Sequence, residues 1–86
     1  MKTFKLVIST PGGNFFDGDI AKISLRGIEG DLAIMANHTP FVTSVKPCNA
    51  HIEFEDGTVK SFNVQRGLVS VALDKVTLMS GSVKWE

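Results

Sequence analysis

Apolar and polar residues alternate with a period of two along most of this chain, whereas helical periodicity is hard to find. This alternation is typical of strands that are buried on one face and solvated on the other. The apolar residues that share a face within each run are Phe4, Leu6 and Ile8; Ala21, Ile23 and Leu25; Ile52 and Phe54; Val69, Val71 and Leu73; and Val76 and Leu78. The pattern predicts an all-β protein.

Turn-forming residues separate these runs at the short intervals expected of a sandwich or barrel. The predicted turns are Pro11-Gly12-Gly13-Asn14, Asp17-Gly18, Gly27 to Gly30, Lys46-Pro47, Asp56-Gly57 and Leu73-Asp74-Lys75. A chain of 86 residues has room for one domain, spanning residues 1–86. Two packed sheets are the simplest way to bury so many half-apolar strands. We therefore predict a two-sheet antiparallel β-sandwich of about eight to ten short strands.

The sharpest turn signal is Asp56-Gly57, which predicts a hairpin with a two-residue loop. Its register would set Phe54 opposite Val59 and Glu53 opposite Lys60, so that an apolar pair and an ion pair occupy opposite faces. Phe62 then has the wrong parity to share a core face with Val59. We expect a β-bulge near Lys60-Ser61 to correct this; the alternative is an outward-facing Phe62.

Composition and charge narrow the classes of partner and compartment. Hydrophobic residues make up 43% of the chain and charged residues 21%, as in an ordinary soluble globule. The net charge is zero and neither sign forms a block, which argues against a nucleic-acid partner. Cys48 is the one cysteine, which favours a reducing compartment. We find no signal peptide and no apolar stretch near the roughly 20 residues of a membrane span, so we expect a soluble, cytoplasmic domain.

Sequence patterns for catalysis or metal binding are weak. Pro11-Gly12-Gly13 lacks the downstream residues of a phosphate-binding loop, and no Gly-x-Ser-x-Gly elbow occurs. Cys48 and His51 are three residues apart, so on a strand they would point to opposite faces. A catalytic zinc site usually needs three protein ligands. We therefore expect no catalytic residue, no metal site and no cofactor.

Two loops are candidates for recognition. Glu29 and Asp31 lie in the Gly27–Gly30 bend and its exit, and are either solvated turn residues or an acidic knob for a partner. In His38-Thr39-Pro40, the proline either simply starts a strand at Phe41, or the segment forms an interface with Phe41 and Val42. Spacing alone leaves both pairs of alternatives open.

The order of these motifs resembles the epsilon subunit of F-type rotary ATP synthases, in its amino-terminal β-sandwich domain. The specific part is Glu29-Gly30-Asp31-Leu32-Ala33-Ile34 joined to His38-Thr39-Pro40-Phe41. The other matching segments, which cover nearly all of the chain, are Thr10-Pro11-Gly12-Gly13, Phe16-Asp17-Gly18, Lys46-Pro47, Arg66-Gly67-Leu68 and Asp74 to Leu78. The family usually has other residues at Arg26, Arg66 and Cys48, which affects loop details only. In the family a helical hairpin with a regulatory role follows the sandwich, whereas this sequence ends at Val83 to Glu86, as either an excised domain or a naturally short form, so we assign no regulation to these residues.

The resemblance implies a non-catalytic rotor part that docks the gamma subunit to the ring of c subunits. It would thereby couple proton, or sodium, flow to ATP synthesis. By position, the residues implied to face gamma are Ser9, Thr10, His38, Thr39, Pro40, Phe41 and Val42, and those implied to face the ring are Glu29, Gly30 and Asp31. The implied location is the cytoplasmic side of the bacterial cell membrane, reached only through the complex.

Two other functions stay open from the sequence. One is a small β-sandwich ligand-binding or adaptor domain unrelated to the synthase. The other is a thiol-dependent enzyme that uses Cys48.

Overall fold

A computed structural model describes every residue of the chain except Met1 and His38. The described residues form ten strands and no helix, which confirms the all-β prediction. The strands are β1 (Phe4–Thr10), β2 (Gly13–Ile20), β3 (Lys22–Gly27), β4 (Gly30–Met35), β5 (Phe41–Val45), β6 (Cys48–Glu53), β7 (Val59–Val64), β8 (Gly67–Val71), β9 (Lys75–Ser80) and β10 (Val83–Trp85). His38 was predicted to face gamma, and it lies outside the described residues.

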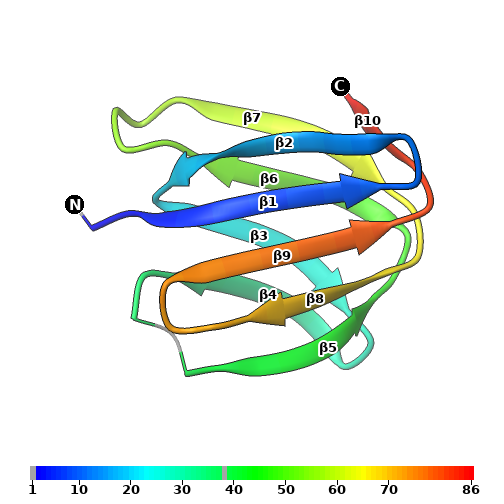
Figure 1. Ribbon diagram of the computed structural model, residues 1–86, viewed down its shortest axis with the longest axis horizontal. Coiled ribbons are helices and arrows are strands. Elements are labelled where there is room, and N and C mark those ends of the chain that lie inside the picture. The colour runs from blue at the N-terminus through cyan, green and yellow to red at the C-terminus, as the bar shows by residue number, and fades with distance from the viewer. Residues whose placement is uncertain (1, 38) are drawn as a thin grey trace.

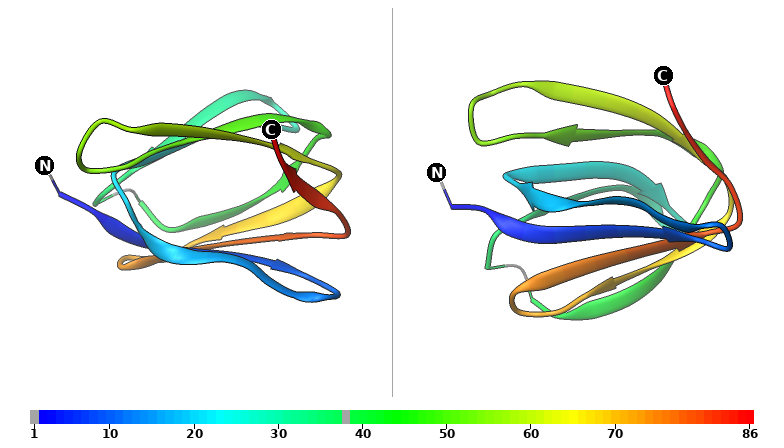
Figure 2. Two further views of the ribbon diagram at one scale, coloured as in Figure 1. Left: turned by 90° about the horizontal axis from the view of Figure 1, so that it is seen from above. Right: turned by 45° about the horizontal axis from the view of Figure 1, so that its top comes forward.

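The strands form two layers that face each other across the core (Figures 1 and 2). The hydrogen-bonded order is β10-β7-β6-β3-β5-β8-β9-β1-β2, with β4 on the remaining side of β3. We call β10, β7, β6, β3 and β4 the β6 layer, and β5, β8, β9, β1 and β2 the β1 layer. The pairing of β3 with β5 joins the layers along one side, so the predicted sandwich is confirmed. Pairing is antiparallel except between β1 and β9, which run parallel because the β8–β9 hairpin returns beside β1.

The core is built from the strand faces that the alternation predicted. Residues of every clear run point inward and are almost fully buried: Phe4, Leu6, Ile8, Ile23, Leu25, Ile52, Val69, Val71, Val76 and Leu78. Phe54 is half-buried against this core, and Leu73 is outside it, because Leu73 lies in the turn between β8 and β9 and is 77% exposed. One contiguous cluster of apolar side chains therefore holds the two layers together.

The β6–β7 hairpin differs from its predicted register by one residue. Glu53 pairs with Val59 and Ile52 with Lys60, so the connection between the strands is longer than two residues. The shifted register turns Phe62 into the core, where it is fully buried opposite Ala50, and leaves Val59 exposed. The pairing runs unbroken from Cys48 to Glu53, so the expected bulge near Lys60-Ser61 is absent from this hairpin.

A bulge occurs instead in the β1–β2 hairpin. Ile8 pairs with Phe16 and Ser9 with Asn14, which leaves Phe15 as the extra residue. The prediction of a turn at Asp17-Gly18 is wrong, because both residues continue β2 opposite Val7 and Leu6. A side chain at Gly18 would come within 3.2 Å of the Phe16 ring, so this glycine makes room for an aromatic residue rather than for a bend.

Aromatic side chains close the open side of the sandwich, away from the β3–β5 pairing. Trp85 of β10 stacks on Phe15 of β2, with ring centroids 4.7 Å apart. It also meets the edge of Phe16 at 6.1 Å and of the buried Phe62 at 5.9 Å. We call Phe15, Phe16, Phe62 and Trp85 the aromatic cluster. It links the last strand of the β6 layer to the last strand of the β1 layer.

Candidate docking surfaces

The predicted acidic loop is the exposed tip of the β3–β4 hairpin. Gly27 pairs with Gly30, and Ile28 and Glu29 form the turn between them. Gly30 has a φ of +129°, a conformation that glycine adopts without steric cost. Glu29, Gly30 and Asp31 are all exposed there. The hairpin therefore presents two carboxylates beside an exposed apolar residue, Ile28.

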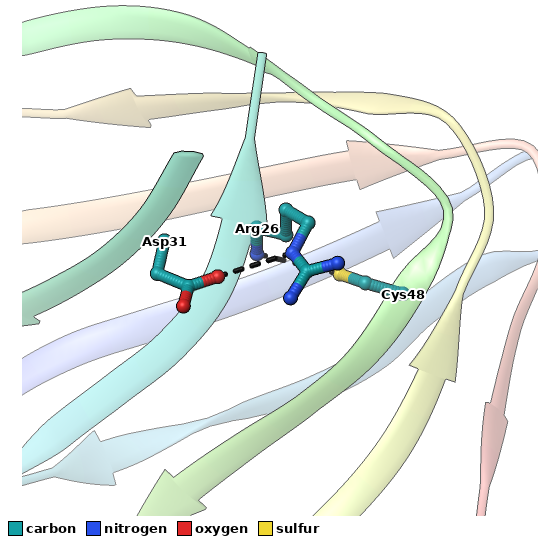
Figure 3. Close-up of polar contacts among 3 residues, drawn as sticks. All are labelled: Arg26, Asp31 and Cys48. Atoms are coloured by element: carbon teal, nitrogen blue, oxygen red, sulfur yellow. Dashed lines mark hydrogen bonds and ion pairs between the residues drawn. The ribbon is translucent and has the colours of Figure 1, made fainter. Parts of the chain in front are cut away.

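Arg26 partly neutralises this tip. Its Nε donates a hydrogen bond to Oδ1 of Asp31 at 3.1 Å, directly across the hairpin (Figure 3). Both side chains are well exposed, so the pair contributes about 0–1 kcal/mol. The pair sets the direction of the Asp31 carboxylate more than it adds stability.

Cys48 and His51 have separate structural partners. The Cys48 Sγ accepts a hydrogen bond from the backbone N–H of Arg26 at 3.4 Å, and its side chain packs against the core (Figure 3). The Nδ1 of His51 lies 2.8 Å from Oγ of Ser61 on the exposed outer face. Both residues border an open groove on the β6 layer. Among the described residues, no three histidine, cysteine or acidic side chains gather as metal ligands.

The outer face of the β1 layer is largely uncharged. Its outward residues form two rows across β5, β8, β9 and β1: Val42, Ser70, Thr77 and Val7 in one, and Ser44, Leu68, Met79 and Ser9 in the other. Val42, Leu68 and Met79 are 61%, 38% and 41% exposed. Lys5, Asp17 and Lys75 lie toward one margin. An exposed apolar patch with a charged margin is typical of a protein interface.

Of the residues predicted to face gamma, Ser9 and Val42 both belong to this outer face, on strands β1 and β5. Phe41 points the other way and is half-buried against the core. Thr10 ends β1, where its Oγ1 donates to the carbonyl of Gly13 at 3.0 Å. Thr39 and Pro40 are exposed in the connection that leads into β5. The fold thus brings Ser9 and Val42 onto one surface, whereas the other described residues of the predicted gamma set lie elsewhere.

Leu68 and Met79 are members of this face that sequence analysis missed. A signal was available, because each is a large apolar residue in the polar phase of its strand. Leu68 is out of phase with Val69 and Val71, and Met79 with Val76 and Leu78. Such a residue must project from the outer face.

The outer face of the β6 layer is more polar, because its exposed apolar residues Met35 and Val59 are separated in the sheet by Lys22 and Glu53. Asn63 donates to Asn49 and Gln65 donates to Asn63, both at 2.9 Å, and His51 and Ser61 form a second cross-strand pair. These side chains satisfy one another along the surface. The two outer faces of the sandwich therefore differ in chemistry, and the apolar one is the candidate for docking.

A groove brings the acidic hairpin next to the apolar face. Its walls come from the hairpin and from β5, and its lining residues are Gly27, Glu29, Gly30, Asp31, Leu32, Phe41, Val42 and Thr43. Phe41 and Val42 of the residues predicted to face gamma thus line the same groove as Glu29, Gly30 and Asp31, which were predicted to face the ring. Within the described residues, no helix has the length and apolarity to cross a bilayer.

The fold and its surfaces define a small β-sandwich domain with one apolar outer face and an acidic hairpin beside it. Residues 3–86 match the family of the ATP synthase delta/epsilon chain β-sandwich domain, and the chain belongs to that family. The match covers nearly the whole chain and confirms the resemblance inferred from the motifs.

Relatives of known identity agree. The chain is 37% identical over 84 residues to the sodium-ion-specific ATP synthase epsilon chain of Acetobacterium woodii, and 36% identical over 84 residues to the ATP synthase epsilon chain of Clostridium novyi. These matches include 98% of this chain but 63% and 64% of the relatives. The chain thus spans just under two thirds of their length.

Solved structures share the fold. A chain of the Euglena gracilis mitochondrial ATP synthase structure, which holds OSCP, F1 and the c-ring, superposes with a TM-score of 0.91 at 19% identity, over 96% of this chain and 53% of that one. A chain of the Tetrahymena thermophila mitochondrial ATP synthase central stalk and c-ring superposes with a TM-score of 0.78 at 19% identity. The match covers 95% of this chain and 66% of that one. At this identity the likeness establishes the sandwich fold.

Proposed function

We propose that this chain is a non-catalytic rotor subunit in the central stalk of an F-type ATP synthase. It joins the gamma subunit to the c-ring and so couples proton translocation to ATP synthesis. Family membership supports this, as do relatives that are epsilon chains and a structural neighbour from a central stalk and c-ring assembly. In this role it is held at the cytoplasmic side of the bacterial membrane through the complex alone.

The outer face of the β1 layer contacts gamma in this proposal. The observation that carries it is the difference between the two outer faces: Val42, Leu68 and Met79 are exposed on the neighbouring strands β5, β8 and β9, whereas on the other face the exposed Met35 and Val59 are separated by Lys22 and Glu53. Removing these apolar side chains from water favours association. The surrounding serine and threonine hydroxyls tolerate burial when they find hydrogen-bond partners on gamma.

The tip of the β3–β4 hairpin contacts the ring. Glu29 and Asp31 supply negative charge on an exposed turn, which suits polar or basic loops. The remainder of the domain acts as a stiff bracket, because a close-packed core between two hydrogen-bonded layers deforms little.

A pair of valines tests the gamma contact with a matched control. Val42 and Val59 are 61% and 55% exposed, but they lie on the outer faces of different layers. Val42→Asp should raise the Kd for purified gamma by more than about tenfold, because an unpaired carboxylate would be buried in the interface. A tenfold change corresponds to about 1.4 kcal/mol of binding free energy. Val59→Asp should leave the affinity within about twofold of wild type. Equal effects of the two variants would refute the assigned face.

Two acidic residues test the ring contact in the same way. Glu29→Lys and Asp74→Lys make the same change in net charge at exposed turns, but Asp74 lies in the β8–β9 turn, away from the β3–β4 hairpin. Glu29→Lys should reduce retention on c-ring membranes, and added salt should shrink its difference from wild type. Asp74→Lys should behave as wild type. Unchanged retention of the Glu29→Lys variant would exclude this loop from the ring contact.

A further inference from the structure

The two layers of the sandwich meet at one strand pairing, between the end of β3 and the end of β5. Gly27 pairs with Val45, which is 1% exposed. Two backbone hydrogen bonds flank the pair: Ile28 N–H donates to the Ser44 carbonyl at 3.1 Å, and Lys46 N–H donates to the Arg26 carbonyl at 3.0 Å. We call this pairing and its two flanking bonds the seam. Within the described residues, it is the strand pairing that connects the β6 layer to the β1 layer.

The seam lies between the two docking surfaces. On the β3 side, Gly27 is the root of the hairpin whose tip carries Glu29. On the β5 side, Val42 stands three residues before Val45 on the apolar outer face. Residues of both surfaces line a groove whose wall includes Gly27 of the seam.

The hairpin tip has few other supports. Ile28, Glu29, Gly30 and Asp31 are all exposed, so little of the core reaches them. The Arg26–Asp31 pair joins the two hairpin strands to each other rather than to the β1 layer. The flanking bond from Ile28 to Ser44 is the backbone contact that ties the turn itself to β5.

Resting on the proposed function, we propose that the seam couples the two docking surfaces, so that gamma and the c-ring bind this chain cooperatively. A partner that holds β5 restrains the seam and with it the hairpin root, so the second partner loses less conformational entropy on binding. The coupling is reciprocal, because binding of the ring must raise the affinity for gamma by the same factor as gamma raises the affinity for the ring. Gly27, Val45 and the backbone N–H of Ile28 then position both contacts.

One substitution removes a seam hydrogen bond with little other change. Ile28→Pro deletes the N–H that donates to Ser44. Proline suits the first of the two turn residues, and Ile28 does not have the positive φ that would oppose it. Ile28→Ala is the matched control, since it also removes the isoleucine side chain but keeps the N–H.

The measurement is the Kd of the chain for c-ring membranes with and without saturating gamma, and the Kd for gamma alone. In wild type and Ile28→Ala, gamma should lower the Kd for the ring by about fivefold or more, within the usual range of coupling between sites. In Ile28→Pro this factor should fall below about twofold, while affinity for gamma alone stays near that of Ile28→Ala. Ile28→Pro retaining the full factor would overturn the proposal.

Hydrogen exchange on the wild-type chain gives a second test that does not depend on the folding of a variant. The Lys46 amide should exchange more slowly when either gamma or the ring is bound alone, because each restrains the seam. Exchange unaffected by both partners would also overturn the proposal. A wild-type chain that binds neither partner refutes the proposed function, whereas one that binds both with independent affinities refutes the seam coupling alone.

Discussion

Asp56 illustrates how one side chain sets the geometry of a hairpin loop. Its Oδ1 accepts the Thr58 N–H at 2.9 Å, while Gly57, at a φ of +90°, donates to the Phe54 carbonyl at 2.9 Å. The hydrogen bond from the Thr58 backbone holds the pKa of the Asp56 carboxyl below its usual value. This loop replaces the predicted two-residue turn and moves the β6–β7 register by one residue.

The lowered pKa predicts a pH-dependent contribution to stability. A carboxyl with a depressed pKa stabilises the fold above its unfolded-state pKa of about 3.9, and that contribution is lost as the pH falls through the folded-state pKa. Asp56→Asn should therefore be less stable than wild type at pH 7, with the difference narrowing as the pH falls from 7 into the acid range. Urea unfolding midpoints across this range measure it.

The control for this prediction is Glu55→Gln, which removes the neighbouring exposed charge but leaves the Asp56–Thr58 hydrogen bond in place. A constant difference between wild type and Asp56→Asn at every pH would contradict the role given to the carboxylate.

At the scale of elements, β10 closes the sandwich although it has only three residues. It pairs with β7, and Trp85 carries its contact with the opposite layer through Phe15 and Phe16. The ammonium of Lys60 lies 5.4 Å from the Trp85 ring centroid and adds a cation–π contact. Ser80 ends β9, just before the connection to β10. Its hydroxyl lies within hydrogen-bond distance of the carbonyls of Gln65, Arg66 and Ser82, and so fixes the start of that connection.

The aromatic cluster predicts a measurable loss of stability on truncation. Trp85 is 43% exposed, so Trp85→Ala should cost about 2 kcal/mol, less than the roughly 3–5 kcal/mol of a fully buried aromatic residue. Trp85→Phe should recover part of this through stacking on Phe15. Urea unfolding followed by far-UV circular dichroism measures both variants. A Trp85→Ala variant as stable as wild type would show that this side of the sandwich needs no closure.

At the scale of the whole molecule, the fold depends on contacts between distant parts of the chain. β1 pairs with β9 over five residue pairs, from Lys5 with Lys75 to Ser9 with Met79, so the sheet cannot be completed until both ends of the chain meet. The β3–β5 pairing and the aromatic cluster likewise join separate segments. Loop-closure entropy must be overcome before such contacts contribute to stability.

This topology predicts slow folding for so small a domain. Refolding should take milliseconds to seconds, as for other all-β sandwiches, rather than the microseconds of helical bundles. The chain has one tryptophan and no tyrosine, so stopped-flow fluorescence reports closure at Trp85 specifically. Completion of the Trp85 signal within about a hundred microseconds would contradict the dependence on distant pairings.

The alternation along the chain was sufficient to predict the class of fold and most of the core. Leu6, Ile23 and Leu78 are buried as expected, because side chains two residues apart on a strand must share a face. The acidic turn at Glu29 was also predictable, since the glycines on either side permit a tight bend. These features depend on near neighbours in the sequence, where periodicity and turn chemistry act directly.

The tertiary structure determined the features that depend on which strands pair and in which register. Phe62 became a core residue because the Asp56 loop set the register with β6, and Phe15 turned inward because β2 bulges against β1. Leu68 and Met79 joined Val42 on one face only through the order β5-β8-β9-β1. Alternation within a strand assigns each residue to a face, but only pairing between distant strands determines which faces become one surface.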